Sequence, residues 1–107
     1  MSHKTYSMLL TRKNSEGFIY AFFEWDIVDQ EGRTQNNGNF MYVRDIEVHP
    51  SYDGKLVISD FIKELEEDPR NKDVLWIYWK REKRNGKFSR PFRRATALRR
   101  LQCLYAR

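Results

Sequence analysis

Three titratable side chains alternate with apolar ones near the middle of the chain. Asp45, Glu47 and His49 flank Ile46 and Val48. Because successive side chains of a strand point to opposite faces, a strand here places all three titratable groups on one face. Carboxylates and imidazoles can accept a proton in catalysis. The alternative interpretation is that the three groups form the solvated face of a sheet.

The C-terminal quarter carries a second set of candidates. Residues 80–107 contain eleven Lys or Arg and one acid, Glu82, whereas residues 1–79 contain nine Lys or Arg and fourteen Asp or Glu, a net charge of −5. Arginine forks onto phosphate, and interleaved aromatic rings such as Phe92 can stack on bases. The candidate nucleic-acid contacts are Lys83, Arg84, Lys87, Phe88, Arg90, Arg93 and Arg94. The alternatives are that these arginines pair with the acidic body, that they cover the sheet edge, or that they form a solvated cationic face.

Other patterns of catalytic residues are absent from the sequence. The two histidines, His3 and His49, have no partners at metal-ligand spacing, so we expect no metal site. The sequence contains no P-loop, dinucleotide-binding fingerprint or Gly-x-Ser-x-Gly motif. The single Cys103 lies among apolar neighbours, which predicts a buried or half-buried thiol rather than a nucleophile.

The length of 107 residues predicts one domain, with residues 1–79 as an acidic body and residues 80–107 as a basic hairpin and helix. The aromatic content of 15% predicts a packed core. No apolar run approaches the ~20 residues that span a bilayer, and the first six residues contain no signal-peptide core. We therefore expect a soluble cytoplasmic protein with no membrane partner.

The alternation of apolar residues predicts antiparallel strands in the first half. Strands over 5–11 and 18–28, joined by a turn at 14–17, should form a hairpin. A polar loop over 29–39 should lead to a strand over 40–49. The odd-numbered positions of 18–28 are all apolar, and we expect this aromatic strand to lie at a sheet edge, where it could pair in a dimer.

Helical spacing begins after Gly54. The apolar positions of a helix over 55–67 are Ile58, Phe61, Ile62 and Leu65. Residues 74–79 are apolar throughout, which predicts an interior strand covered on both faces and parallel to 40–49. Asn85-Gly86 predicts a hairpin turn, and Pro91 predicts a basic helix from 91 to 105. The expected fold class is α+β, a mostly antiparallel mixed sheet with one β-α-β crossover helix and a C-terminal helix.

The order of elements around this crossover also resembles a known family. An apolar strand ends at Val48-His49-Pro50, the loop Tyr52-Asp53-Gly54-Lys55 follows, and then come an amphipathic helix and a hydrophobic strand. Residues 40–80 in this order resemble the central motif of the GNAT superfamily of N-acetyltransferases. The loop departs from the family pattern at Asp53, Leu56 and Ile58, where the family has Arg or Gln and two glycines.

The resemblance implies acyl-CoA-dependent N-acyltransfer, with acetyl-CoA and an amine acceptor as partners. It implies that the backbone at Ile46 and Val48 binds the pantetheine arm and that Gly54 and Lys55 bind the pyrophosphate. It also implies a general base among Asp45, Glu47 and His49, with Tyr78 or Tyr105 protonating the leaving thiolate. Tyr78 has a second interpretation, as a core aromatic.

Three functions therefore remain as hypotheses. The first is a GNAT-like acyltransferase or a degenerate, non-catalytic relative of one. The second is a small nucleic-acid-binding protein that uses the basic segment. The third combines them, with the basic segment supplying phosphate ligands for CoA that the altered loop lacks.

Overall fold

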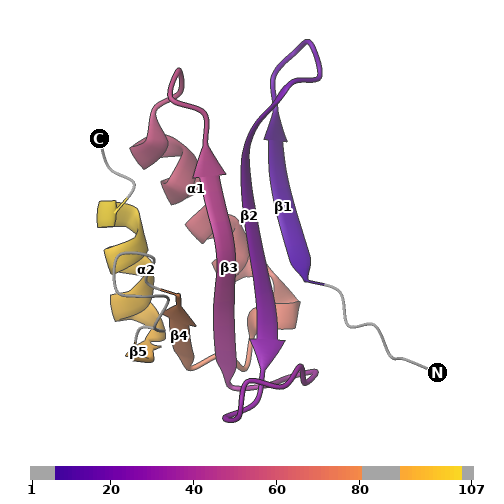
Figure 1. Ribbon diagram of the computed structural model, residues 1–107, viewed down its shortest axis with the longest axis vertical. Coiled ribbons are helices and arrows are strands. Elements are labelled where there is room, and N and C mark those ends of the chain that lie inside the picture. Colours follow the sequence, from indigo (N-terminus) through magenta and orange to yellow (C-terminus); the bar gives the residue numbers. More distant parts are fainter. Residues whose placement is uncertain (1–6, 81–89, 105–107) are drawn as a thin grey trace, which may run out of the picture.

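The structure is a computed structural model that describes residues 7–80 and 90–104. Its strands are β1 (Met8–Lys13), β2 (Ile19–Val28), β3 (Phe40–Val48), β4 (Trp76–Trp79) and β5 (Phe92–Arg93). Its helices are α1 (Gly54–Glu67), α2 (Arg94–Leu104) and the short 3-10 helix η1 (Pro69–Asn71). The strands form one sheet with α1 and α2 packed on the same face (Figure 1), which confirms the predicted α+β class.

The strand order in the sheet is β1-β2-β3-β4-β5. All neighbours are antiparallel except β3 and β4, which are parallel and joined through α1. This arrangement confirms the predicted crossover. It also places β2 between β1 and β3, so the prediction that 18–28 is an edge strand is wrong, and the sheet edges are β1 and β5.

The predicted hairpin of β1 and β2 is confirmed. The Asn14 side chain accepts hydrogen bonds from the backbone N–H groups of Glu16 and Phe18 at 2.9 and 3.0 Å, and Gly17 adopts a φ of +86° that favours glycine. Alternation then turns one face of β2 toward the helices. Its buried odd-numbered residues are Ala21, Phe23, Trp25 and Ile27.

Strand β3 contains a bulge that the sequence reading missed. Asp45 pairs with Glu24 and Val43 pairs with Trp25, which leaves Arg44 as an extra residue. The inward positions consequently change from odd-numbered, as at Val43, to even-numbered, as at Ile46. A bulge rotates the strand in this way because two residues oppose one on the partner strand.

Helix α1 forms where its apolar spacing predicts it. The Asp53 carboxylate caps the helix by accepting from the backbone N–H groups of Lys55 at 3.0 Å and Leu56 at 3.3 Å. Ile58, Phe61 and Leu65 are buried against the sheet.

One buried polar side chain, Asn71, links the end of α1 to the sheet. The indole N–H of Trp25 donates to Asn71 Oδ1 at 3.0 Å, and Asn71 Nδ2 donates to the carbonyl of Leu65 at 3.0 Å. Asn71 is fully buried. A buried amide is favourable here because both of its polar atoms have partners.

Two predictions about the C-terminal half are wrong. Strand β4 is interior in the sheet, but residues 74–79 are not buried throughout, because Leu75 is 58% exposed and Trp76 and Tyr78 are only half-buried. The final helix starts at Arg94 rather than at 91, because Phe92 and Arg93 pair with Ile77 and Trp76 as β5.

The prediction for Cys103 is also wrong, since its side chain is exposed. The buried residues of α2 are Ala97, Leu98 and Leu101. This face contacts α1 and β4, so Cys103 lies on the opposite side of the helix. Within the described ranges, no helix is long and apolar enough to cross a membrane.

Candidate functional site

Each arginine of the acidic body is paired with a carboxylate. Arg12 contacts Asp60 and Glu64, each at 2.8 Å. The remaining pairs are Arg33 with Asp29 at 3.4 Å and with Glu31 at 3.8 Å, Arg44 with Asp26 at 2.8 Å, and Arg70 with Asp68 at 2.6 Å. Hydrogen bonding to Arg70 lowers the pKa of Asp68 below its ordinary value. The guanidinium groups of the body are therefore engaged internally.

The arginines that follow β4 behave differently. Within the described residues, Arg90, Arg93, Arg99 and Arg100 have no carboxylate within 4.0 Å and no hydrogen-bond acceptor, although all four are exposed. Three of them lie over aromatic rings instead. Arg90 and Arg100 lie 5.1 and 4.5 Å from the centroid of Phe92, and Arg93 lies 5.3 Å from the centroid of Trp76.

These four arginines belong to β5, to the residues just before it and to α2, and they are called here the basic surface. Arg90 and Arg100 share the ring of Phe92, and Arg99 adjoins Arg100 on α2. Phe92 is 6% exposed and points to the helix side, where it stacks on Trp79, so Arg93 points to the opposite side of β5. The basic surface therefore extends around the β5 edge of the sheet. It runs from the face opposite the helices, called here the open face, to α2.

This geometry changes the roles of two candidate residues. Arg94 donates from Nη1 to the carbonyls of Asn71 at 2.7 Å and Val74 at 3.3 Å, so it ties α2 to the chain before β4. Phe92 was expected to stack on bases, but it is buried in the core. Four other predicted contacts, Lys83, Arg84, Lys87 and Phe88, lie outside the described residues, as does the hairpin turn at Asn85-Gly86.

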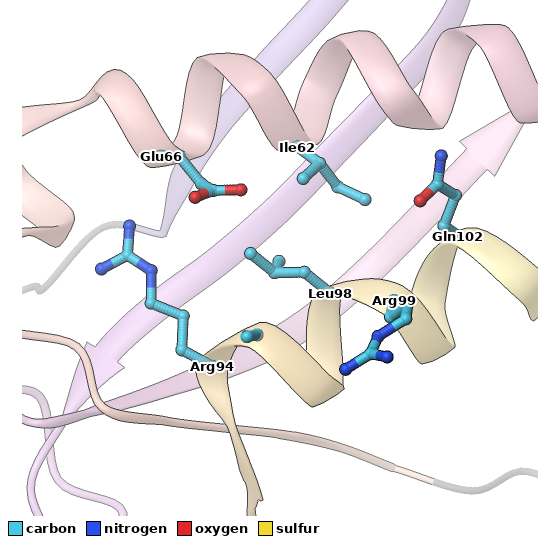
Figure 2. A pocket seen from close by; sticks show the side chains of 7 residues that line it. Ile62, Glu66, Arg94, Leu98, Arg99 and Gln102 are labelled. Carbon is cyan, nitrogen blue, oxygen red and sulfur yellow. The ribbon is translucent and has the colours of Figure 1, made fainter.

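A groove of about 390 Å³ lies between α1 and α2 (Figure 2). Its floor is apolar, with Ile62 of α1 facing Leu98 of α2. Its rim carries both signs of charge, because Glu66 lies across the groove from Arg94. Arg99 of the basic surface also lines this groove. The mixed charge of the rim attracts a polyanion less than arginines alone would.

The proposed general bases lie at the far end of β3. Asp45, Glu47 and His49 are all exposed. His49 Nδ1 accepts a hydrogen bond from the backbone N–H of Ser51 at 3.1 Å, and its ring edge packs against Phe18 at 5.5 Å. The imidazole therefore stabilises the turn that leads into α1.

Tyr78 does not lie with these residues. It stacks on Tyr42 with ring centroids 5.2 Å apart, and Tyr42 precedes Asp45 by three residues, about 10 Å along a strand. Burial, followed by the nearby Tyr42, Asp26 and Asp29, raises the pKa of Tyr78 above its ordinary value. The phenol is therefore protonated at neutral pH and is a weaker acid than an ordinary tyrosine.

The residues proposed for CoA binding have mixed surroundings. Pairing of β3 with β4 ends at Val43 and Trp79, so within the described chain the β4-facing edge of β3 beyond Val43, including Ile46 and Val48, is not paired with β4. At the N-terminus of α1, by contrast, the Asp53 carboxylate takes the amides of Lys55 and Leu56.

The sequence reading also missed a cluster of aromatic side chains on the open face of the sheet. Phe40, Tyr42, Trp76 and Tyr78 are half-buried and occupy adjacent positions of β3 and β4. The available signal was the alternation of these residues with the inward-facing Met41 and Ile77, together with the parallel register.

Within residues 7–80 and 90–104, no three His, Cys, Asp or Glu side chains form a group that could hold a metal ion. A search against protein-family models and a search of curated proteins both returned no match for this chain.

Proposed function

We propose that this protein binds nucleic acid through the basic surface of Arg90, Arg93, Arg99 and Arg100. The observation that carries the proposal is the pairing state of the arginines. The body neutralises its own guanidinium groups with carboxylates, whereas these four have none within 4.0 Å in the part of the chain that the structure describes. Exposed guanidinium groups without internal acceptors are suited to fork onto phosphate oxygens.

The charge distribution makes the binding strength depend on salt. Each phosphate neutralised by the protein releases counterions, and the logarithm of the binding constant falls with the logarithm of salt by about 0.7 to 0.9 per contact. Four arginines that each contact one phosphate predict a slope of about −3. The acidic body repels the same polymer, so binding should be confined to the β5 edge and α2.

The test measures binding of a fluorescently labelled 20-nucleotide DNA, as a single strand and as a duplex, between 50 and 200 mM NaCl. The protein should bind, and its affinity should fall steeply with salt. A variant with Arg90, Arg93, Arg99 and Arg100 all changed to Gln should lose most of the affinity and nearly all of the slope. Salt-independent binding, or no binding at 50 mM NaCl, would contradict the proposal.

The matched control removes the same number of charges from the body. Its variant changes Lys13, Lys55, Lys63 and Lys72 to Gln, four exposed lysines outside the basic surface. The two variants have the same net charge. If both lose affinity equally, the effect comes from overall charge and the basic surface is not the binding site.

A second candidate is acyl-CoA binding by a GNAT-like core. The observation that favours it is the β4-facing edge of β3 beyond Val43, because in the family the strand at this place binds the pantetheine arm through its backbone. The Asp53 cap opposes it, since the carboxylate occupies helix amides and repels a pyrophosphate. The raised pKa of Tyr78 makes it a weaker proton donor than an ordinary tyrosine, and Tyr78 lies far from Asp45 and Glu47.

Thermal unfolding with acetyl-CoA tests this candidate. A ligand that binds only the folded state raises the midpoint. An Asp53→Asn variant keeps an N-cap side chain without the negative charge, so it should show a larger shift than the native protein if the loop binds pyrophosphate. No shift at millimolar acetyl-CoA in either protein would exclude the acyltransferase.

A further inference from the structure

The open face of the sheet, opposite the helices, carries a block of aromatic side chains beside the basic surface. Met41 and Ile77 are buried toward the helices, so their neighbours along β3 and β4 point to the open face. The parallel register pairs these neighbours across the two strands. The resulting aromatic block consists of Phe40 paired with Trp76 and Tyr42 paired with Tyr78.

The block joins the basic surface through Arg93. Arg93 pairs with Trp76 across β4 and β5, and its guanidinium lies 5.3 Å from the indole centroid. Tyr42 and Tyr78 stack with an angle of 22° between their rings. Trp76 and Tyr78 lie two residues apart on β4, about 7 Å along the strand, and Trp76 is the one that pairs with Arg93 of β5.

Three acids of the open face lie on its other half. Glu24 of β2 pairs with Asp45 of β3, and Glu47 lies further along β3. Two acids lie beside the block, and each is paired with an arginine: Asp26, the neighbour of Tyr42, with Arg44 at 2.8 Å, and Asp29 with Arg33 at 3.4 Å. A polyanion on the open face is therefore repelled from the β1–β2 half and drawn to β4 and β5.

We propose that the aromatic block stacks the bases of a single-stranded nucleic acid whose phosphates lie on the basic surface. The inference rests on the proposed function and adds the form of the polymer. Aromatic platforms beside a basic track bind single strands, because only unpaired bases expose their faces to side chains. A duplex can reach the arginines but not the block.

The test compares labelled oligo(dT) of 20 nucleotides with the same strand annealed to oligo(dA), using the native protein and a Trp76→Leu variant. The native protein should bind the single strand about tenfold more tightly than the duplex. Trp76→Leu keeps an apolar side chain without a ring, and it should lose most of that preference while its duplex affinity is unchanged. Trp76→Phe keeps a ring and should retain most of the preference.

The matched control is Phe22→Leu, because Phe22 is a half-buried aromatic of the open face that pairs with Glu47 in the acidic half. It should bind both DNAs as the native protein does. Near-UV circular dichroism confirms that each variant is folded. If Trp76→Leu does not fold, Trp76→Phe and the native preference for single strand over duplex decide the question.

The outcomes separate the two proposals. If neither DNA binds, the proposed function fails. If both bind with the same salt-dependent affinity, the basic surface stands and the aromatic block has no role. A loss of duplex affinity in Trp76→Leu equal to its loss of single-strand affinity also overturns the inference.

Discussion

The acidic body and the C-terminal part of this protein use arginine in different ways. In the body, Arg12 joins β1 to α1 through two carboxylates, and its guanidinium lies 4.6 Å from the ring centroid of Phe61. At the β5 edge, Arg100 lies over Phe92 in a similar way but has no carboxylate partner among the described residues. The ring contact is common to both, and the missing acid is the difference. The comparison indicates that arginine stabilises the fold in the body and is available to a partner at the edge.

The largest expected effect concerns the buried hydrogen bonds of the acidic body. Asn71→Ala removes the acceptor of Trp25 Nε1 and the donor to the Leu65 carbonyl, both buried. Leaving two buried polar groups without partners costs about 3 kcal/mol of unfolding free energy. Urea unfolding measures it, and DNA binding at a temperature where the variant is folded should be unchanged. A loss below about 1 kcal/mol would mean that water replaces the amide.

The next effect tests the edge. Arg93→Gln removes one phosphate contact, so the salt slope of DNA binding should fall by about one and the affinity at 0.1 M salt by up to about tenfold. Anisotropy titrations at several salt concentrations measure both. The unfolding free energy should stay within about 0.5 kcal/mol of the native value. If Arg93→Gln lost stability but bound DNA as the native protein does, Arg93 would stabilise the fold as the arginines of the body do.

The third prediction compares the same substitution, Arg to Gln, in the two regions. Arg12→Gln removes a partly buried guanidinium with two carboxylate partners, which should lower the unfolding free energy by about 1 kcal/mol. Arg100→Gln is the matched variant and should leave stability nearly unchanged, because no acid is left unpaired. Equal effects in urea unfolding would show that the pairing state does not distinguish the regions.

The smallest effect concerns pH. The folded pKa of Asp68 is lowered, with the hydrogen bond from Arg70 as the largest cause, so the folded state binds this proton less readily than the unfolded state. Its contribution is complete above about pH 4 and is lost as pH falls below that value. Asp68→Asn keeps a capping side chain but removes the charge, so its stability should fall less between pH 5 and pH 2.5, by a few tenths of a kcal/mol. The measurement is urea unfolding of both proteins at several pH values. If their unfolding free energies fell equally between pH 5 and pH 2.5, the lowered pKa of Asp68 would be contradicted.

Local patterns predicted most of the first half of the fold. The spacing of Ile58, Phe61 and Leu65 predicted α1, and the alternation in β2 predicted its buried face, because each depends on one period of the backbone. The bulge at Arg44 was missed because nothing local requires it. It depends on how β3 pairs with β2.

The C-terminal half was less predictable for the same reason. The segment beginning at Pro91 reads as a helix, but the pairing of Phe92 with Ile77 and the hydrogen bond from the Arg94 backbone N–H to the Leu75 carbonyl at 2.9 Å delay the helix to Arg94. Cys103 reads as buried from its neighbours, yet α2 turns Ala97 and Leu101 inward instead. Tertiary pairing outweighs local propensity where a segment is short.

The candidate site was also predicted only in part from the sequence. The sequence by itself determined that an acidic body precedes a basic segment, that a crossover helix joins two parallel strands, and that arginines alternate with aromatic residues near the C-terminus. Only the tertiary structure decided which arginines are neutralised. An ion pair needs a carboxylate within about 4 Å, and that depends on which elements pack together, as α1 does with Arg12 and as no acidic element among the described residues does with Arg93.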